Sequence, residues 1–104
     1  MKEQQTIISV SDLSTEHGRE YLSQLCNHLI KRVQVEVEGQ TARIRLPIGT
    51  CELAANKTAI NVQVRATTDH IDRMEAVFGG LIERYAFREN VNLMWQRAML
   101  TKGN

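Results

Sequence analysis

Two cysteines and three histidines are the side chains of this chain best suited to metal or thiol chemistry. Cys26 and His28 stand two residues apart in the stretch QLCNHL. Because successive helical residues are about 100° apart around the axis, these two side chains point in different directions and cannot hold one ion. Metal-binding helices use residues four apart instead. We therefore predict no metal ligand in this stretch and no cofactor for the chain.

The thiols of Cys26 and Cys51 allow a thiol or redox enzyme as one interpretation. Cys26 falls in the apolar stripe of an expected helix and Cys51 at an inward position of an expected strand, where the two thiols can touch. A catalytic thiolate needs exposure and a neighbouring cation, and a structural zinc ion needs four ligands. Core packing is therefore the preferred role of both cysteines, and the thiol enzyme stays as the alternative.

His28 lies at the edge of the same helical stripe, with Tyr21 one heptad before it and Arg32 four residues after it. Three hydrogen-bonding side chains along one helix edge can hold a polar or anionic ligand. The simpler alternative is a solvated edge on which His28 bonds Tyr21 or a backbone carbonyl. We take Tyr21, His28 and Arg32 as candidate binding residues and assign no catalytic residue.

The helix that positions these residues is recognised by apolar side chains that recur every three or four residues. They are Leu22, Leu25, Cys26, Leu29, Ile30 and Val33. A short β-type run at residues 6–10 precedes the helix. Residues 11–15, SDLST, are typical of a helix cap and are expected to separate the two elements.

After the first helix the apolar period changes to two, and three turn signals divide residues 33–66 into four strands. The turns are Gly39-Gln40, Pro47-Ile48-Gly49 and Asn56-Lys57, with predicted loops of two, four and two residues. These loops place all the apolar side chains on one face, namely Val35, Val37, Ala42, Ile44, Leu46, Cys51, Leu53, Ile60, Val62 and Val64. A one-residue slip at any turn destroys that agreement.

The opposite face of the predicted sheet is polar, and its charges are expected to pair across the strands. The predicted register sets Glu36 opposite Arg43 and Arg45 opposite Glu52. The face has no aromatic side chain on which a nucleic-acid base can stack. Nucleic-acid binding is therefore the least favoured of the alternative functions.

A second helix is predicted from residues 67–69 onward, with an apolar stripe. Its members are Ile71, Met74, Phe78, Leu81, Ile82 and Tyr85. Gly79-Gly80 inside it favours close packing over a hinge. The alternation of Val91, Leu93 and Trp95 then predicts a last strand, followed by a flexible tail at 99–104.

The predicted order is β-α-β-β-β-β-α-β, a single α+β domain over residues 1–98. Both helices are expected on the apolar face of an antiparallel sheet. The formal net charge of +1 gives no general attraction to nucleic acid or to an anionic membrane. The start of the chain lacks the apolar stretch of a signal peptide, so we predict a cytoplasmic location.

Three segments and Trp95 resemble the bacterial domain-of-unknown-function 2218 family. The segments are residues 21–28 (YLSQLCNH), 46–53 (LPIGTCEL) and 81–89 (LIERYAFRE), and the likeness spans nearly the whole chain. Two residues depart from the family pattern: Ile48 stands where the family typically has an aromatic residue, and Tyr85 where it typically has Phe. The resemblance implies a TATA-binding-protein-like arrangement of sheet and helices, similar also to the small C-terminal domain of phosphohexomutases.

Arg88 lies after the second helix within one of these segments. A guanidinium there can bind an anionic group through two hydrogen bonds. Pairing with nearby side chains and with the last carbonyls of the helix is the preferred alternative. Arg88 completes the set of candidate binding residues.

Domains similar to this family occur alone or joined to flavin-dependent siderophore-interacting reductases, so the resemblance implies an accessory role in iron acquisition. We predict a non-catalytic binding or accessory module linked to siderophore-iron utilisation. Its expected partners are a protein such as a siderophore-interacting flavin reductase, a small polar ligand, or a second copy of the chain. Nucleic acid and membrane are not among them.

Overall fold

The structure, a computed structural model, describes residues 5–89, 91 and 93–100. Within these residues six strands form one sheet: β1 (Thr6–Ser14), β2 (Gln34–Glu38), β3 (Thr41–Leu46), β4 (Gly49–Ala55), β5 (Ala59–Thr67) and β6 (Gln96–Leu100). The helices are α1 (Gly18–Leu29) and α2 (Ile71–Tyr85), and a short 3-10 helix, Phe87–Glu89, follows α2. The strand order is β2-β3-β4-β5-β1-β6, and all neighbours are antiparallel.

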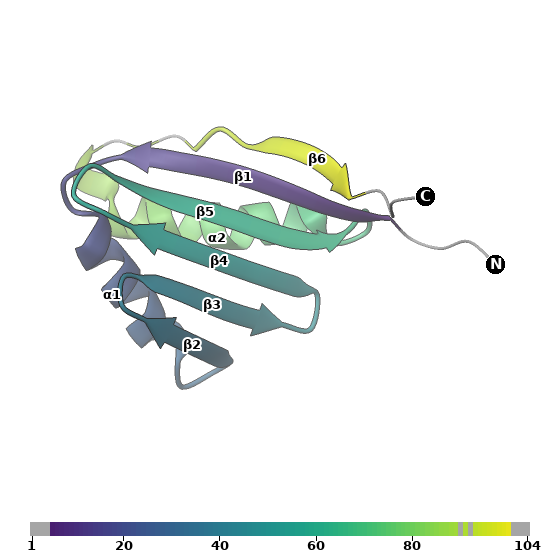
Figure 1. Ribbon diagram of the computed structural model, residues 1–104, viewed down its shortest axis with the longest axis horizontal. Helices are drawn as coiled ribbons and strands as arrows, with labels where there is room; N and C mark the ends of the chain where they lie inside the picture. The colour runs from purple at the N-terminus through teal and green to yellow at the C-terminus, as the bar shows by residue number, and fades with distance from the viewer. Residues whose placement is uncertain (1–4, 90, 92, 101–104) are drawn as a thin grey trace.

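Both helices lie against one face of the sheet, and the other face is open (Figure 1). This confirms the predicted α+β class and the predicted order of elements. The core lies between the helices and the covered face, and its largest fully buried side chains include Phe78, Leu25, Ile44, Leu53, Ile60, Ile71, Met74 and Ile82. In the part of the chain that the structure describes, no helix is long and apolar enough to span a membrane.

The hairpin between β2 and β3 has the predicted two-residue loop. Val35 lies opposite Ile44 and Val37 opposite Ala42, as expected. Gly39 in the loop has a φ of 61°, a left-handed conformation that glycine adopts at little cost. Val37 is nevertheless 53% exposed, near the end of the edge strand β2.

The next two loops differ from the prediction in length. Leu46 pairs with Gly49, so the β3–β4 loop has two residues and not four. Ala55 pairs with Ile60, so four residues, 56–59, lie between the last paired residues of β4 and β5, where two were predicted. In that loop the Asn56 side chain accepts hydrogen bonds from the backbone N–H groups of residues 58 and 59, each at 2.8 Å, which stabilises the longer turn.

Both errors in loop length shift the register by an even number of residues. Since strand side chains alternate with a period of two, such a shift leaves each side chain on its predicted face. It does change the partners across the strands. Glu52 lies opposite Arg43, and Arg45 lies opposite Thr50, so the predicted pairing of Arg45 with Glu52 was wrong.

The segment between β1 and α1 also differs from the prediction. Residues 11–14, expected in a helix cap, continue β1, and α1 begins only at Gly18. Ser9 and Ser11 are buried at inward strand positions of β1. Thr15 supplies the local turn, because its Oγ1 accepts the backbone N–H of His17 at 3.0 Å.

The last strand lies later in the chain than predicted. Val91, Leu93 and Trp95 are not part of a strand; they pack against the core as partly buried side chains. β6 follows them and reaches Leu100, so residues 99 and 100 belong to a strand and not to a tail, while 101–104 lie outside the described residues. Gly79 packs against Trp95, but a Cβ there would lie 3.5 Å from Nε1 of Trp95, an ordinary contact, and a Cβ at Gly80 would meet nothing within 4 Å. The predicted close packing therefore does not require glycine at either position.

Candidate functional site

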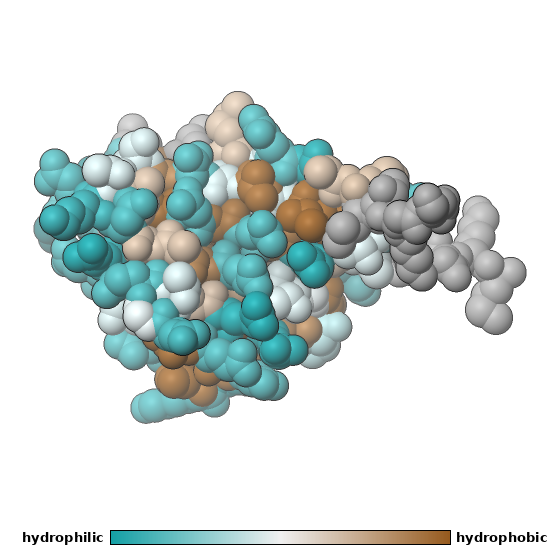
Figure 2. Space-filling view, in the orientation of Figure 1, coloured by the Kyte–Doolittle hydropathy of each residue, from teal (hydrophilic) through white to brown (hydrophobic). Residues whose placement is uncertain are grey.

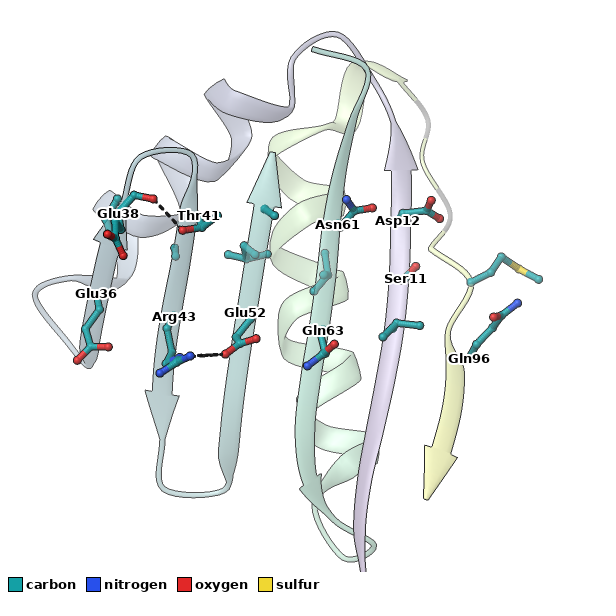
Figure 3. A pocket seen from close by; sticks show the side chains of 17 residues that line it. Ser11, Asp12, Glu36, Glu38, Thr41, Arg43, Glu52, Asn61, Gln63 and Gln96 are labelled. Carbon is teal, nitrogen blue, oxygen red and sulfur yellow. Dashed lines mark hydrogen bonds and ion pairs between the residues drawn. The ribbon is translucent and has the colours of Figure 1, made fainter. Parts of the chain in front are cut away.

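The open face of the sheet presents its side chains in rows that run across the strands. One row, read from β2 to β6, contains Glu36, Arg43, Glu52, Gln63, Val10 and Gln96. The next row contains Glu38, Thr41, Ala54, Asn61 and Asp12. Figure 3 shows both rows side by side on the face away from the helices. The pairing of the strands therefore brings together polar side chains from distant parts of the sequence.

A surface hollow of about 1180 Å³ follows these two rows. Four carboxylates line it, those of Asp12, Glu36, Glu38 and Glu52, against the single guanidinium of Arg43. Arg43 is already paired, since its Nη2 lies 2.8 Å from Oε2 of Glu52. The hollow is therefore acidic.

Amide groups complete the polar lining of the hollow. Asn61, Gln63 and Gln96 line it, and among the described residues none of these three amides has a hydrogen-bond partner. Each amide offers both donors and an acceptor. The surface can thus form hydrogen bonds of either sense with a molecule that covers it.

The β1 end of the hollow is apolar. Val10 is 39% exposed there and Met94 is 80% exposed. Figure 2, which views the open face, shows brown side chains over β1 between teal ones. An unbranched, polarisable methionine adapts its shape to different partners. The hollow thus offers an apolar contact next to its polar groups.

Tyr21, the first of the predicted binding residues, is buried at the rim of the core. Its hydroxyl donates a hydrogen bond to Oε2 of Glu89, and Oγ1 of Thr15 donates to the same oxygen at 2.7 Å. These two bonds, that of Tyr21 foremost, lower the pKa of Glu89. The pKa of Tyr21 is raised, first by burial and then by the Glu89 carboxylate. The tyrosine hydroxyl thus has an internal partner.

The other predicted binding residues have different surroundings from Tyr21. His28 is half-buried and packs edge-on against the ring of Tyr85, with ring centroids 6.5 Å apart. Arg32 is exposed, and the exposed guanidinium of Arg88 lies 5.6 Å from the ring centre of its neighbour Phe87. In the described chain no hydrogen bond joins any two of these four residues. Their role in binding stays a prediction.

Sequence reasoning missed the structural role of Glu89, the last residue of the segment AFRE, which accepts hydrogen bonds from Tyr21 and Thr15. The contact from Glu89 to Tyr21 spans 68 residues of sequence. The only local signal was the position of this carboxylate next to Arg88 in a segment shared with the family. Its partners depend on how the 3-10 helix meets α1, which no local pattern encodes.

A second missed cluster joins α2 to β1 and β6. Arg97 donates from Nε and Nη2 to the two carboxylate oxygens of Glu75, each at 2.7 Å, and Nη2 also reaches Asp72. The fully buried Ser9 donates to Oε2 of Glu75 at 2.6 Å. The bond from Arg97 and that from Ser9 hold the pKa of Glu75 below its ordinary value, although partial burial acts in the opposite sense. The charged groups of this cluster bind one another, and the cluster holds β6 against α2.

Both cysteines are free and buried. Burial raises the pKa of the Cys26 thiol, and burial raises that of Cys51 far more. A thiol with a raised pKa carries little thiolate at neutral pH, and the thiolate is the nucleophile. The geometry therefore supports core packing for both residues and does not support a thiol enzyme.

Comparison with known proteins agrees with this fold. Residues 10–96 match a family described as "Uncharacterized protein conserved in bacteria (DUF2218)", and the chain belongs to this family. The chain is also similar to a solved structure, the NMR structure of PA4090 from Pseudomonas aeruginosa, with a TM-score of 0.75 and 25% sequence identity. That match covers 86% of this chain and 95% of the other. No curated protein matches the chain.

Proposed function

We propose that this protein is a non-catalytic binding module that contacts a protein partner through the open face of its sheet. The observation that carries the proposal is the acidic hollow of about 1180 Å³ on this face, with three amides that have no hydrogen-bond partner among the described residues. Enclosed sites for small molecules measure about 300–1,000 Å³ and bury most of the ligand. This hollow lies along a sheet surface, which suits a protein segment better than a small molecule.

The lining of the hollow indicates the chemistry of the partner. Its carboxylates favour Lys or Arg side chains, since complementary charge guides association and penalises wrong partners. The amides can bond a polar side chain or an exposed backbone. Val10 and Met94 give an apolar side chain of the partner a place to pack. A basic surface with an apolar residue at one side fits this description.

We place the module in siderophore-iron utilisation, as an accessory protein of a flavin-dependent siderophore-interacting reductase. Support for this step comes from the family resemblance, in which similar domains occur joined to such reductases. The acidic face supports contact with a basic surface on the partner. A small polar ligand bound at Tyr21, His28, Arg32 and Arg88 is the alternative binding mode.

The test measures binding of the siderophore-interacting reductase from the same bacterium by isothermal titration calorimetry. We expect the double variant Asn61→Ala/Gln63→Ala to weaken binding about tenfold or more, the effect of losing one or two good contacts at an interface. The matched control is Gln24→Ala/Asn27→Ala, which removes two solvent-exposed amides from α1, on the other side of the sheet from the hollow.

The control is expected to bind within about twofold of the wild type, well under the 1.4 kcal/mol of a tenfold change. Equal losses in both double variants would show that the open face is not the contact surface. A reductase that does not bind the wild-type protein would refute the siderophore-linked role. A loss of binding confined to His28→Ala and Arg88→Ala would favour the alternative binding mode at Tyr21, His28, Arg32 and Arg88.

A further inference from the structure

Beside the acidic rows, the open face carries a basic row. Its side chains, read from β2 to β1, are Gln34, Arg45, Thr50, Arg65 and Ile8. A small hollow of about 230 Å³ adjoins the large one and is lined by Arg43, Arg45, Thr50, Glu52, Gln63 and Arg65. Three of these residues, Arg43, Glu52 and Gln63, line both hollows. The polarity of this hollow differs from that of the large one, because guanidiniums outnumber carboxylates three to one in its lining.

The three guanidiniums differ in how far they are committed to internal partners. Arg43 is held by Glu52, with Nε at 2.9 Å and Nη2 at 2.8 Å from Oε2. Arg45 reaches Glu36 only at 3.8 Å, and both side chains are about half exposed. Such an exposed, loosely formed pair contributes little to stability. The side chain of Arg65 is exposed and has no hydrogen bond or ion pair within the described chain.

The geometry of the sheet lets Arg45 and Arg65 act on one group. They lie on β3 and β5, directly opposite Thr50 on the strand between them. Neighbouring strands are about 4.8 Å apart, so the two arginines start about 10 Å apart, a separation that two long side chains can close. The hydroxyl of Thr50 lies between them and has no hydrogen-bond partner among the described residues.

We propose that Arg45, Thr50 and Arg65 form a binding site for a small molecule with a dianionic phosphate group. Each guanidinium presents a planar fork of donors that matches two phosphate oxygens. The Thr50 hydroxyl donates to the oxygen that faces the sheet. Two cations and one neutral donor match a charge of two, the charge that a phosphate monoester approaches at neutral pH.

The neighbouring carboxylates restrict what the site accepts. Glu52 lines the small hollow, Glu36 lies 3.8 Å from Arg45, and Glu38 lies further along the same face. A nucleic-acid backbone, which places many phosphates along the sheet, would meet all of these carboxylates. A single compact phosphate group between Arg45 and Arg65 would meet only the nearest of them. The site therefore favours a small phosphate. The three residues that would hold it, Arg45, Thr50 and Arg65, do not line the acidic hollow of the proposed protein contact.

The experiment is a titration of the ¹⁵N-labelled protein with inorganic phosphate and, separately, with glycerol phosphate, followed by two-dimensional NMR at constant ionic strength. We expect saturable shifts centred on Thr50 and Arg65. Arg65→Gln should weaken binding about tenfold or more, the effect of losing a charge-assisted contact. Thr50→Val should weaken it by a smaller factor. Saturation with glycerol phosphate but not with phosphate alone identifies a monoester site.

The matched control is Arg73→Gln, which removes an exposed positive charge from α2 on the covered side. It should leave the affinity unchanged. Lowering the pH from about 7.5 to 5 adds a proton to phosphate and should weaken its binding, whereas sulfate keeps both charges and should not weaken.

Equal weakening by Arg65→Gln and Arg73→Gln would overturn the proposal, because it would show only a response to net charge. Shifts that never saturate, or an affinity that Arg65→Gln and Thr50→Val both leave intact, would also overturn it. Tighter binding of a single-stranded oligonucleotide than of glycerol phosphate would replace the small-phosphate site with a nucleic-acid surface. The dispersion of the NMR spectrum of each variant establishes that it is folded.

Discussion

Arg97 and Arg65 project from opposite faces of the same sheet into very different surroundings. Arg97 lies on the covered face, where α2 supplies Glu75 and Asp72 as partners. Arg65 lies on the open face and has no ion pair among the described residues. A charge beneath a helix is matched within the fold because the helix brings carboxylates to it. A charge on the open face depends on water or on a bound molecule, so that face is where binding is expected.

The largest expected effect tests the covered face. Leu25→Ala removes a fully buried side chain from α1 and should lower the free energy of unfolding by about 2–5 kcal/mol. The matched change on the open face is Val10→Ala, which should cost less than about 1 kcal/mol because Val10 is 39% exposed. Urea denaturation measures both. Equal losses would contradict the division into a covered and an open face.

The next largest effect concerns the cluster around Glu75. Glu75→Gln removes the negative charge that Arg97 binds and should cost about 1–2 kcal/mol at pH 7, toward the lower end because Arg97 is 41% exposed. The pKa of Glu75 is lowered in the folded protein, so its contribution is present above its ordinary value of 4.5 and is lost as the pH falls further.

The difference between wild type and Glu75→Gln in urea melts should therefore shrink below about pH 4.5. Glu83→Gln, on the same helix but without an ion pair in the described chain, is the control and should cost less than Glu75→Gln at pH 7. A difference that is independent of pH would mean that the charge of Glu75 does not stabilise the fold.

A smaller effect is expected where Tyr21 meets Glu89. Tyr21→Phe removes one of the two hydroxyls that donate to the Glu89 carboxylate and should cost about 0.5–1.5 kcal/mol. It should also raise the pKa of Glu89 toward its ordinary value, because the Tyr21 bond is the main cause of the lowered value. NMR titration of the Glu89 side chain checks this. An unchanged pKa would rule out the bond in solution.

The smallest expected effect is that of Arg65→Gln on stability. This change should alter the free energy of unfolding by less than about 0.5 kcal/mol, because the side chain is exposed and has no internal partner in the described chain. Arg97→Gln, measured in the same way, should cost more. If the order of the two were reversed, Arg65 would have a structural role and the contrast between the faces would fail.

The faces of the strands could be predicted from sequence because alternation with a period of two is unaffected by an even shift in register. The lengths of two of the three hairpin loops could not, and the consequence falls on the open face. In the predicted register Arg45 lies opposite Glu52 and is neutralised. In the observed register Arg45 lies opposite Thr50, in one row with Arg65. A difference of two residues in the β3–β4 loop thus decides whether Arg45 faces a carboxylate or lies in a basic row.

Other differences have equally specific causes. The alternation of Val91, Leu93 and Trp95 resembles a strand, but it reflects side chains that pack on the core without strand pairing. The bonds from Tyr21 to Glu89 and from Ser9 to Glu75 join residues more than 60 positions apart. Local patterns predict which residues are buried or exposed; they do not predict which distant side chains meet.

The strand order has a consequence for how the chain folds. β2 to β5 follow one another through short loops and can pair as soon as they are made, with little loop-closure entropy. β1 must then pair with β5, and β6, synthesised last of the six described strands, must pair with β1. Until β6 arrives, one edge of β1 has no partner and can pair with another chain. We expect slow steps in refolding, and any aggregation, to involve this edge.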